Sequence, residues 1–128
     1  MSGEVYKFIS FMARRPDVSP EAFRDYYETV HARIGEEISA KVGVSRYFRR
    51  YVERLAVTGD ADPNAFPYDV ITEVWFDNRE DFERVVNSVP QGNLPDGVAS
   101  DEEQFLDRSK TRFITVVECE SDLEALRL

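Results

Sequence analysis

The stretch EVYKFISFMARRPDVSPEAFRDYYETVHARI, residues 4–34, joins two elements of secondary structure through a sharp break. Its first part, residues 4–15, is rich in aromatic and branched side chains, which is typical of a β-strand. The segment PDVSP, residues 16–20, ends that strand. Ser19 is a favourable N-cap, and Pro20 stands at the first helical position, where its missing N–H costs nothing. The stretch therefore predicts a strand that is followed directly by a helix.

Apolar residues recur along the helix that begins at Pro20. Their spacings of four, three and four residues form one apolar stripe, made of Phe23, Tyr27, Val30 and Ile34. Gly43 fits a C-terminal stop, because glycine favours the left-handed conformation that closes many helices. We therefore expect this stripe to pack against a sheet.

The rest of the chain continues the alternation of strands and helices. Further strands are expected at residues 45–55, 68–76 and 110–120, with a loop at 58–67 and helices at 79–89 and 101–109. The order is βαββαβ with a short additional helix before the last strand. Right-handed crossovers then give an α+β, ferredoxin-like sandwich, in which two helices cover one face of an antiparallel four-stranded sheet.

No shift in composition divides the chain, so we expect one domain over residues 1–120. Residues 121–128 would form a short C-terminal helix or tail, opened by Ser121 and Glu124 in capping-box spacing.

Large apolar side chains occupy both faces of the expected sheet. The first strand places Phe8 and Met12 on one face and Ile9 and Phe11 on the other. Leaving one such face in water would expose a larger apolar patch than monomers usually tolerate. We therefore expect a symmetric homodimer that packs sheet on sheet. The alternative is that the terminal helix folds back over its own sheet.

The composition excludes several classes of partner. The 128 residues carry 25 acidic and 16 basic side chains, so the formal charge of −9 repels nucleic acid and anionic membranes. The single cysteine, Cys119, has no partner for an internal disulfide. The sequence has no apolar run of the roughly 20 residues that span a bilayer. We therefore expect a cytoplasmic protein that binds neither nucleic acid nor membrane.

His31, the only histidine, is the first candidate for chemistry. It lies four residues after Tyr27 and three before Ile34, so it borders the apolar stripe. An unperturbed imidazole is the side chain that titrates near neutral pH, so a histidine here could take a proton from a substrate and return it elsewhere. A structural histidine, bonded to a backbone carbonyl or a tyrosine, explains the same pattern.

Aromatic residues are the candidates for substrate binding. Two phenols would bond substrate oxygens and two apolar rings would form walls: Tyr27 and Tyr51, then Trp75 and Phe105. Aromatics at such spacing also belong to ordinary cores. Glu73 shares a strand face with Trp75, and an arginine of the preceding strand, Arg49 or Arg50, is its expected partner.

Cofactor motifs are absent from the sequence. There is no glycine-rich phosphate loop and no dinucleotide fingerprint. One histidine and one cysteine cannot build a typical metal site. Asp101, Glu102 and Glu103 are interpreted as the start of a helix, where acidic groups complement the helix dipole. We therefore expect no metal and no cofactor.

Four motifs, taken in order, resemble the EthD-domain family of the dimeric α+β barrel superfamily. They are RRPDVSPEAFRDYYETVHA, RYFRRYV, TEVWFDNREDF and DEEQFLDRSKTRFITVVE, which begin at residues 14, 46, 72 and 101. The resemblance implies a homodimer whose sheets form a barrel, and a pocket between helix and sheet at His31. It also implies action on polyketide-type, aromatic or alicyclic compounds. Arg33 and Tyr51 depart from the family, which often has proline and a second histidine there.

The favoured interpretation is a small cofactor-independent enzyme, a lyase or isomerase. His31 would move a proton during dehydration, decarboxylation, cyclisation or isomerisation of a hydrophobic ring compound. Two alternatives stay open. One is a cofactor-free monooxygenase or haem-handling protein of the same superfamily, and the other is a non-catalytic small-molecule-binding or stress-response dimer.

Overall fold

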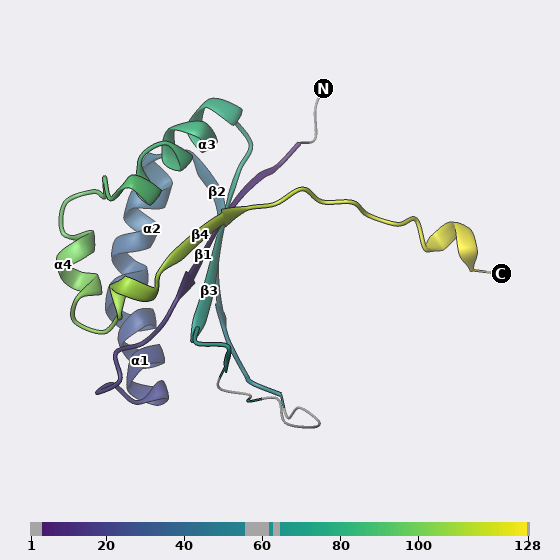
Figure 1. Cartoon of the computed structure of the whole chain (residues 1–128). Coiled ribbons are helices and arrows are strands. Elements are labelled where there is room, and N and C mark those ends of the chain that lie inside the picture. Colours follow the sequence, from purple (N-terminus) through teal and green to yellow (C-terminus); the bar gives the residue numbers. More distant parts are fainter. Residues whose placement is uncertain (1–3, 56–61, 63–64, 128) are drawn as a thin grey trace.

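A four-stranded antiparallel sheet forms the centre of the molecule, with the long helices on one side (Figure 1). The computed structural model describes residues 4–55, 62 and 65–127. The strand order is β2-β3-β1-β4, with bounds Val44–Tyr51, Val70–Phe76, Tyr6–Met12 and Arg112–Thr115. This order confirms the predicted ferredoxin-like α+β architecture. Most of the predicted loop at 58–67 lies outside the described residues.

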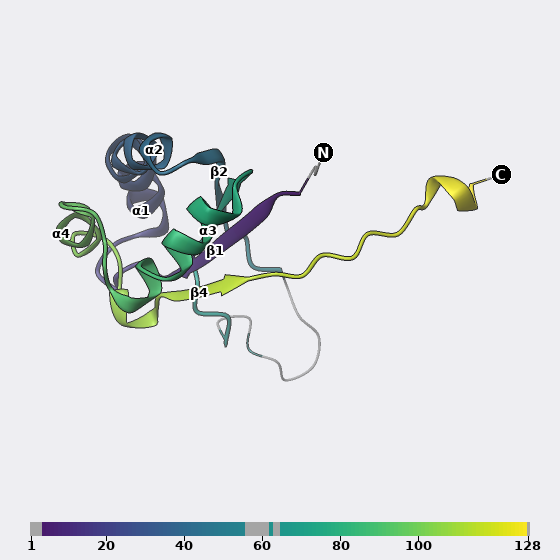
Figure 2. The ribbon, with the colours of Figure 1, turned by 90° about the horizontal axis from the view of Figure 1, so that it is seen from above.

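One long helical segment and two shorter helices cover the sheet. The long segment consists of α1 Pro20–Tyr26, a π-helical turn η1 Tyr27–His31 and α2 Ala32–Lys41. The other elements on this side are α3 Arg79–Val86, η3 Val89–Gln91, α4 Val98–Glu102 and η4 Arg108–Lys110. Seen from above, these helices stay on one side of the sheet (Figure 2).

Local signals fixed the ends of the long helical segment as predicted. The Ser19 side chain accepts a hydrogen bond from the Ala22 N–H, and Pro20 opens α1. Gly43 follows α2 with φ of +89°, a conformation that side chains with a Cβ rarely adopt. Phe23 and Tyr27 then pack against the sheet in a core whose other members are Met12, Ala32, Val70, Phe105 and Leu106.

The π-helical turn changes which side chains of this segment face inward. An added residue in a π-turn rotates the following helix relative to the preceding one. As a result Val30 is 38% exposed, whereas His31 is 6% exposed and takes the inward position. The predicted apolar stripe was therefore wrong at Val30. The same turn carries the histidine from the border of the stripe into the interior.

A valine truncation tests this register. We expect Val30→Ala to change the free energy of unfolding by less than about 0.5 kcal/mol, since substitutions at exposed positions rarely matter more. Urea denaturation of the variant and of the wild type measures the difference. A loss of 1 kcal/mol or more, the order expected for a buried methyl pair, would place Val30 inside and contradict the π-turn.

The face of the sheet opposite the helices, here called the open face, also carries apolar side chains. Its members include Ile9, Phe11, Phe48, Ile71, Trp75 and Ile114. Ile114 is 41% exposed, and Val116 just beyond β4 is 42% exposed. The prediction that both faces of the sheet are apolar is therefore confirmed.

Beyond β4 the chain runs outward as an extended segment, here called the C-terminal arm, residues 116–127. Figures 1 and 2 both show it leaving on the side away from the helices, with only the short turn η5 Glu124–Leu126 near its end. The Asp122 carboxylate accepts a hydrogen bond from the Ala125 N–H at this turn. The arm does not fold back over its own sheet, so this alternative is wrong. No described helix is long and apolar enough to cross a membrane.

Candidate functional site

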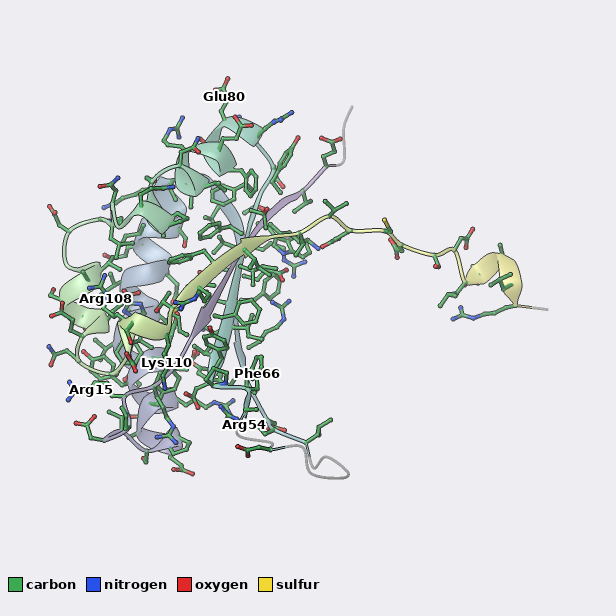
Figure 3. All side chains as sticks on the ribbon, in the orientation of Figure 1. Arg15, Arg54, Phe66, Glu80, Arg108 and Lys110 are labelled. Atoms are coloured by element: carbon green, nitrogen blue, oxygen red, sulfur yellow. The ribbon has the colours of Figure 1, made fainter. Side chains whose placement is uncertain are left out.

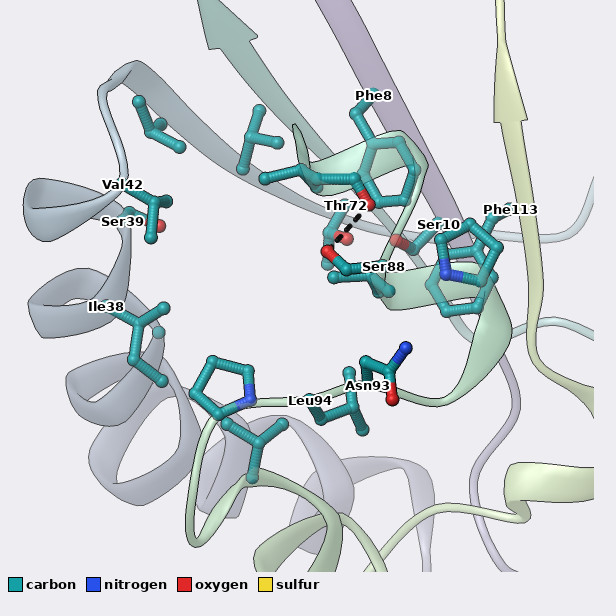
Figure 4. A pocket seen from close by; sticks show the side chains of 18 of the residues that line it. Phe8, Ser10, Ile38, Ser39, Val42, Thr72, Ser88, Asn93, Leu94 and Phe113 are labelled. Atoms are coloured by element: carbon teal, nitrogen blue, oxygen red, sulfur yellow. Dashed lines mark hydrogen bonds between the residues drawn. The ribbon is translucent and has the colours of Figure 1, made fainter. Parts of the chain in front are cut away.

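A cavity of about 710 Å³ lies between the sheet and the helices (Figure 4). This volume is in the range of ordinary small-molecule sites. One wall comes from α2 and the residue after it, with Ile38, Ser39 and Val42. The floor comes from β1 and β3, with Phe8, Ser10 and Thr72. The loop after η3 contributes a third side, with Asn93 and Leu94. Most of its lining is aliphatic or aromatic, so it suits an apolar ligand.

Two hydroxyl groups interrupt the apolar floor. Ser10 on β1 and Thr72 on β3 are partners in the strand register, so their side chains lie next to each other. Both residues are 7% exposed. In the part of the chain that the structure describes, neither hydroxyl forms a hydrogen bond with another protein atom. Buried hydroxyls usually have partners, so these two are suited to bond a polar atom of a ligand.

His31 reaches the cavity from the π-helical turn, and a carboxylate fixes its orientation. Its Nδ1 lies 2.7 Å from Oδ2 of Asp101, and the Tyr26 hydroxyl donates to Oδ1 of the same carboxylate over 2.6 Å. An ionised carboxylate only accepts hydrogen bonds, so Nδ1 carries the hydrogen. In the neutral ring Nε2 is therefore the basic nitrogen. It lies 3.8 Å from Oε2 of Glu102.

Glu102 is the second titratable group at this end of the cavity. Burial raises the pKa of its carboxyl group, and the nearby charges of His31 and Arg108 partly oppose that effect. Nε of Arg108 lies 3.3 Å from Oε1 of Glu102, and Figure 3 shows Arg108 beside α4. The bond to Asp101 raises the pKa of Tyr26 to about 12. An imidazole and a carboxyl group whose pKa is raised by burial thus face the same apolar space.

Two aromatic rings hold the imidazole in place. Tyr27 meets His31 edge to face at 5.0 Å between centroids, and Phe105 lies at 5.1 Å. Burial raises the pKa of Tyr27 well above its ordinary value, so its phenol stays neutral beside the imidazole. Both rings are 1% exposed. They restrict the rotation of His31 and leave Asp101 and Glu102 as the polar neighbours of its ring nitrogens.

The structure brings some of the predicted site residues together and separates others. His31 lines the cavity, whereas the four predicted substrate-binding aromatics do not: Tyr27, Tyr51, Trp75 and Phe105. Tyr27 and Phe105 lie in the core directly behind His31. The Tyr51 hydroxyl is used in a bond to Glu28. Trp75 alternates onto the open face, because successive strand residues point to opposite sides. These four rings therefore lie outside the lining of this cavity, and their roles in substrate binding stay predictions.

Sequence reasoning missed both acidic residues that meet His31. Asp101 and Glu102 were expected to open a helix, but α4 begins at Val98 and they stand at its end. Gly97 precedes α4 with φ of +86° and marks its true start. In the sequence, Gly97 was the available signal that a helix begins at Val98. The hydroxyls of Ser10 and Thr72 were equally inconspicuous, since single polar residues in apolar strands are common.

An ion-pair network holds the outer side of η1 to β2. The Arg49 guanidinium binds both oxygens of Glu28, over 3.0 and 2.8 Å, and the Tyr51 hydroxyl donates to Oε2 over 2.5 Å. These bonds lower the pKa of Glu28 to about 2. On the open face, Arg50 lies 3.4 Å from Glu73, as one of the two predicted pairings.

This network makes a specific contribution to acid stability. The pKa of Glu28 is lowered on folding, so its contribution is present above about pH 4.3, the ordinary glutamate value, and is lost as the pH falls toward 2. We expect Glu28→Gln to lose stability at pH 6 and to flatten the decline between pH 5 and pH 2. Urea unfolding at several pH values measures both effects. An unchanged slope, equal to that of the exposed control Glu37→Gln, would contradict the pairing.

Comparisons with known proteins place this fold among solved structures. An ethyl tert-butyl ether D (EthD) family protein from Bacillus halodurans C-125 has 16% identity and a TM-score of 0.56, over 91% of this chain and all of its own. A dimeric ferredoxin-like protein from an uncultured marine organism has 13% identity and a TM-score of 0.53, over 92% and 93%. A dimeric protein of unknown function and ferredoxin-like fold from Bacteroides fragilis has 15% identity and a TM-score of 0.50, over 88% and 94%.

These identities support a shared fold and no more than that. Among curated proteins, none matches this chain. The family model for the EthD domain, however, matches residues 15–109, a range that includes His31, Asp101 and Glu102. The match covers most of the sequence and most of the elements around the cavity. The chain belongs to the EthD-domain family.

Proposed function

We propose that this protein is a homodimeric, cofactor-independent enzyme that acts on a hydrophobic ring compound by proton transfer at His31. One observation carries the proposal: an imidazole oriented by Asp101 presents its basic nitrogen, together with Glu102, to an apolar cavity. Proton transfer by a positioned side chain contributes about 10²–10⁴-fold to a rate. The compounds that suit the cavity are aromatic, alicyclic or polyketide-like molecules with a few oxygen groups.

The same groups can complete an elimination of water without a redox partner. Nε2 of His31 takes a proton from a carbon of the substrate, and the released electron pair forms a double bond as the neighbouring C–O bond breaks. Glu102 gives its proton to the departing hydroxyl, which leaves as water. Nε2 of His31 lies 3.8 Å from Oε2 of Glu102, so one water molecule between them would carry the proton from His31 back to Glu102 and restore both groups.

The surroundings support each step of this scheme. Asp101 stabilises the imidazolium that forms on His31, because a carboxylate hydrogen-bonded to Nδ1 favours the charged ring. The Ser10 and Thr72 hydroxyls are placed to bond a substrate oxygen from the cavity floor. Decarboxylation, cyclisation and isomerisation use the same base and differ in which bond breaks.

The homodimer has separate support. The open face exposes apolar side chains, whose contact with water is unfavourable. Two of the similar structures are described as dimeric. Packing two open faces together buries both. Since the cavity lies on the helix side of the sheet, each copy would hold its own site.

A panel of compounds tests the proposed activity. The purified protein is incubated with polyketide-like, aromatic and alicyclic hydroxy-ketones without added cofactor, with and without oxygen, and products are followed by mass spectrometry. The matched variant Val42→Trp fills the cavity from the residue that follows α2. We expect at least one compound to lose water or carbon dioxide, or to isomerise, with the wild type and not with the variant.

The results separate this proposal from its alternatives. Turnover that requires oxygen would replace it with an oxidative activity. Compounds that raise the melting temperature of the wild type but are never converted, even at high protein concentration, would make the cavity a binding site only.

A further inference from the structure

The C-terminal arm lies clear of its own domain and is exposed along its length. Val117 is 94% exposed, Leu123 56% and Leu126 76%. Within the described residues, one ion pair ties the arm to the body, between Lys7 on β1 and Glu118, at 2.5 Å. Three exposed apolar side chains on one extended segment are unfavourable in water, so we expect the arm to be covered by another surface in the assembled protein.

The arm is also acidic. Its residues 118–124, ECESDLE, contain four carboxylates and no basic residue. Arg127 pairs with Glu124 at 2.8 Å, which leaves Glu120 and Asp122 without a cationic partner in the described part of the chain. A surface that receives this segment must therefore supply positive charge.

Such a surface lies on the open face, where cations stack on aromatic rings of β2 and β3. We call it the cation–aromatic band: Lys7, Arg46, Phe48, Arg50 and Trp75. The Lys7 ammonium lies 4.4 Å from the centroid of the Trp75 ring, and the Arg50 guanidinium lies 4.6 Å from that of Phe48. The Arg46 guanidinium lies 5.1 Å from the centroid of each of these two rings. Stacking holds these cations flat along the sheet.

The charge on the band is only partly neutralised within its own chain. Glu73 is the acidic residue in its midst, and it is engaged by Arg50 and by the Trp75 Nε1–H. Lys7 is paired with Glu118. Arg46 is exposed and has no carboxylate partner among the residues that the structure describes. The band thus keeps at least one cation without a carboxylate partner, beside two half-buried aromatic rings, Phe48 and Trp75.

We propose that the arm of one copy crosses to a second copy and lays its acidic stretch on the partner's cation–aromatic band. This inference rests on the homodimer proposed above and adds what holds it together. The arm projects into the space in front of the open face, where a partner sheet must lie (Figures 1 and 2). Beyond Glu118, which pairs with Lys7 of its own chain, the arm leads away from its own band. Glu120 and Asp122 can therefore meet the equivalent band only on another copy.

Two-fold symmetry makes the contact reciprocal. If the arm of the first copy reaches the second, the arm of the second reaches the first, and the two contacts form together. Carboxylates on arginine across an interface fix its register and make the association sensitive to salt. The side chains of Leu123 and Leu126, exposed in a single copy, would then be covered by the apolar surface of the partner.

Fluorescence resonance energy transfer between chains tests the contact. The protein has one tryptophan, which serves as the donor, and one cysteine, which can carry the acceptor. The donor chain keeps Trp75 and carries Cys119→Ser. The acceptor chain carries Trp75→Phe and a tryptophan-excited fluorophore on Cys119, which is exposed. In mixed dimers, transfer can occur only from one chain to the other. The comparison acceptor carries Trp75→Phe, Cys119→Ser and the fluorophore at Glu80→Cys on α3, on the helix side (Figure 3).

We expect strong transfer to the arm label and weak transfer to the α3 label. Arg46→Glu in the donor chain should reduce transfer and weaken the dimer about tenfold, since like charges then face each other. Lys41→Glu, an exposed change of equal charge on α2, should do neither. Mixed dimers with equal transfer to both labels would overturn the arm contact and leave the homodimer standing. Chains that sediment only as monomers would overturn both.

Discussion

Replacing His31 by glutamine should abolish most of the activity while leaving ligand binding nearly intact. Glutamine has a similar volume, and its amide can donate to Asp101 as the Nδ1–H does, so the fold and the cavity should survive. It cannot accept and release a proton near neutral pH. We therefore expect kcat to fall by about 10²–10⁴-fold with little change in KM, the contribution typical of general acid–base catalysis.

The measurement uses whichever compound the wild-type protein converts. Steady-state kinetics give kcat and KM, and thermal shift with the same compound shows that the cavity is still formed. Glu37→Gln, an exposed substitution of similar chemistry on α2, is the control and should match the wild type. If His31→Gln kept kcat within a factor of two of the wild-type value, His31 would be a structural histidine. The proposed elimination by His31 and Glu102 would then be wrong, because it would have no base.

Much of the fold could be predicted because its determinants are local or repeat with a regular period. Ser19 and Pro20 start a helix through their own backbone chemistry, and Gly43 ends it for the same reason. Alternation along the first strand assigned Phe8 and Met12 to one face and Ile9 and Phe11 to the other, as the structure has them. The element order then left few possible topologies.

The candidate site resisted prediction because it depends on a break in regularity. A helical period treats Val30 and His31 almost alike, and only the π-turn decides which of them points inward. Asp101 lies 70 residues from His31 along the chain, so no local pattern joins them. A cavity is also a matter of what is left unfilled. Gly35 contributes to it, since a Cβ there would stand 2.9 Å from the Tyr47 hydroxyl.

The distinction between core and cavity has a consequence for Phe105. Sequence reasoning assigned this ring to substrate binding, whereas the structure buries it against three aromatic rings of the long helical segment, Phe23, Tyr26 and Tyr27. The imidazole of His31 forms a fourth neighbour. A residue in that position determines stability first, and it influences the site only through the ring that it supports.

We therefore expect Phe105→Ala to cost about 3–5 kcal/mol of unfolding free energy, the usual range for removing a buried phenylalanine ring. The cost combines lost apolar burial with the cavity that remains behind His31 and Tyr27. Urea denaturation at neutral pH measures it, provided that the transition midpoint shifts without a change in slope. The ring of a substrate-contacting residue facing open space would cost far less to remove.

Phe105→Leu separates volume from ring chemistry. Leucine restores most of the apolar volume, so its cost should stay below about 1.5 kcal/mol, as for other substitutions that nearly conserve size in a core. Substrate affinity measured on this stable variant then isolates any direct role in binding. We expect KM to stay close to the wild-type value, because Phe105 does not line the cavity. A tenfold rise in KM with stability preserved would return Phe105 to the substrate site and would require the cavity to extend behind His31.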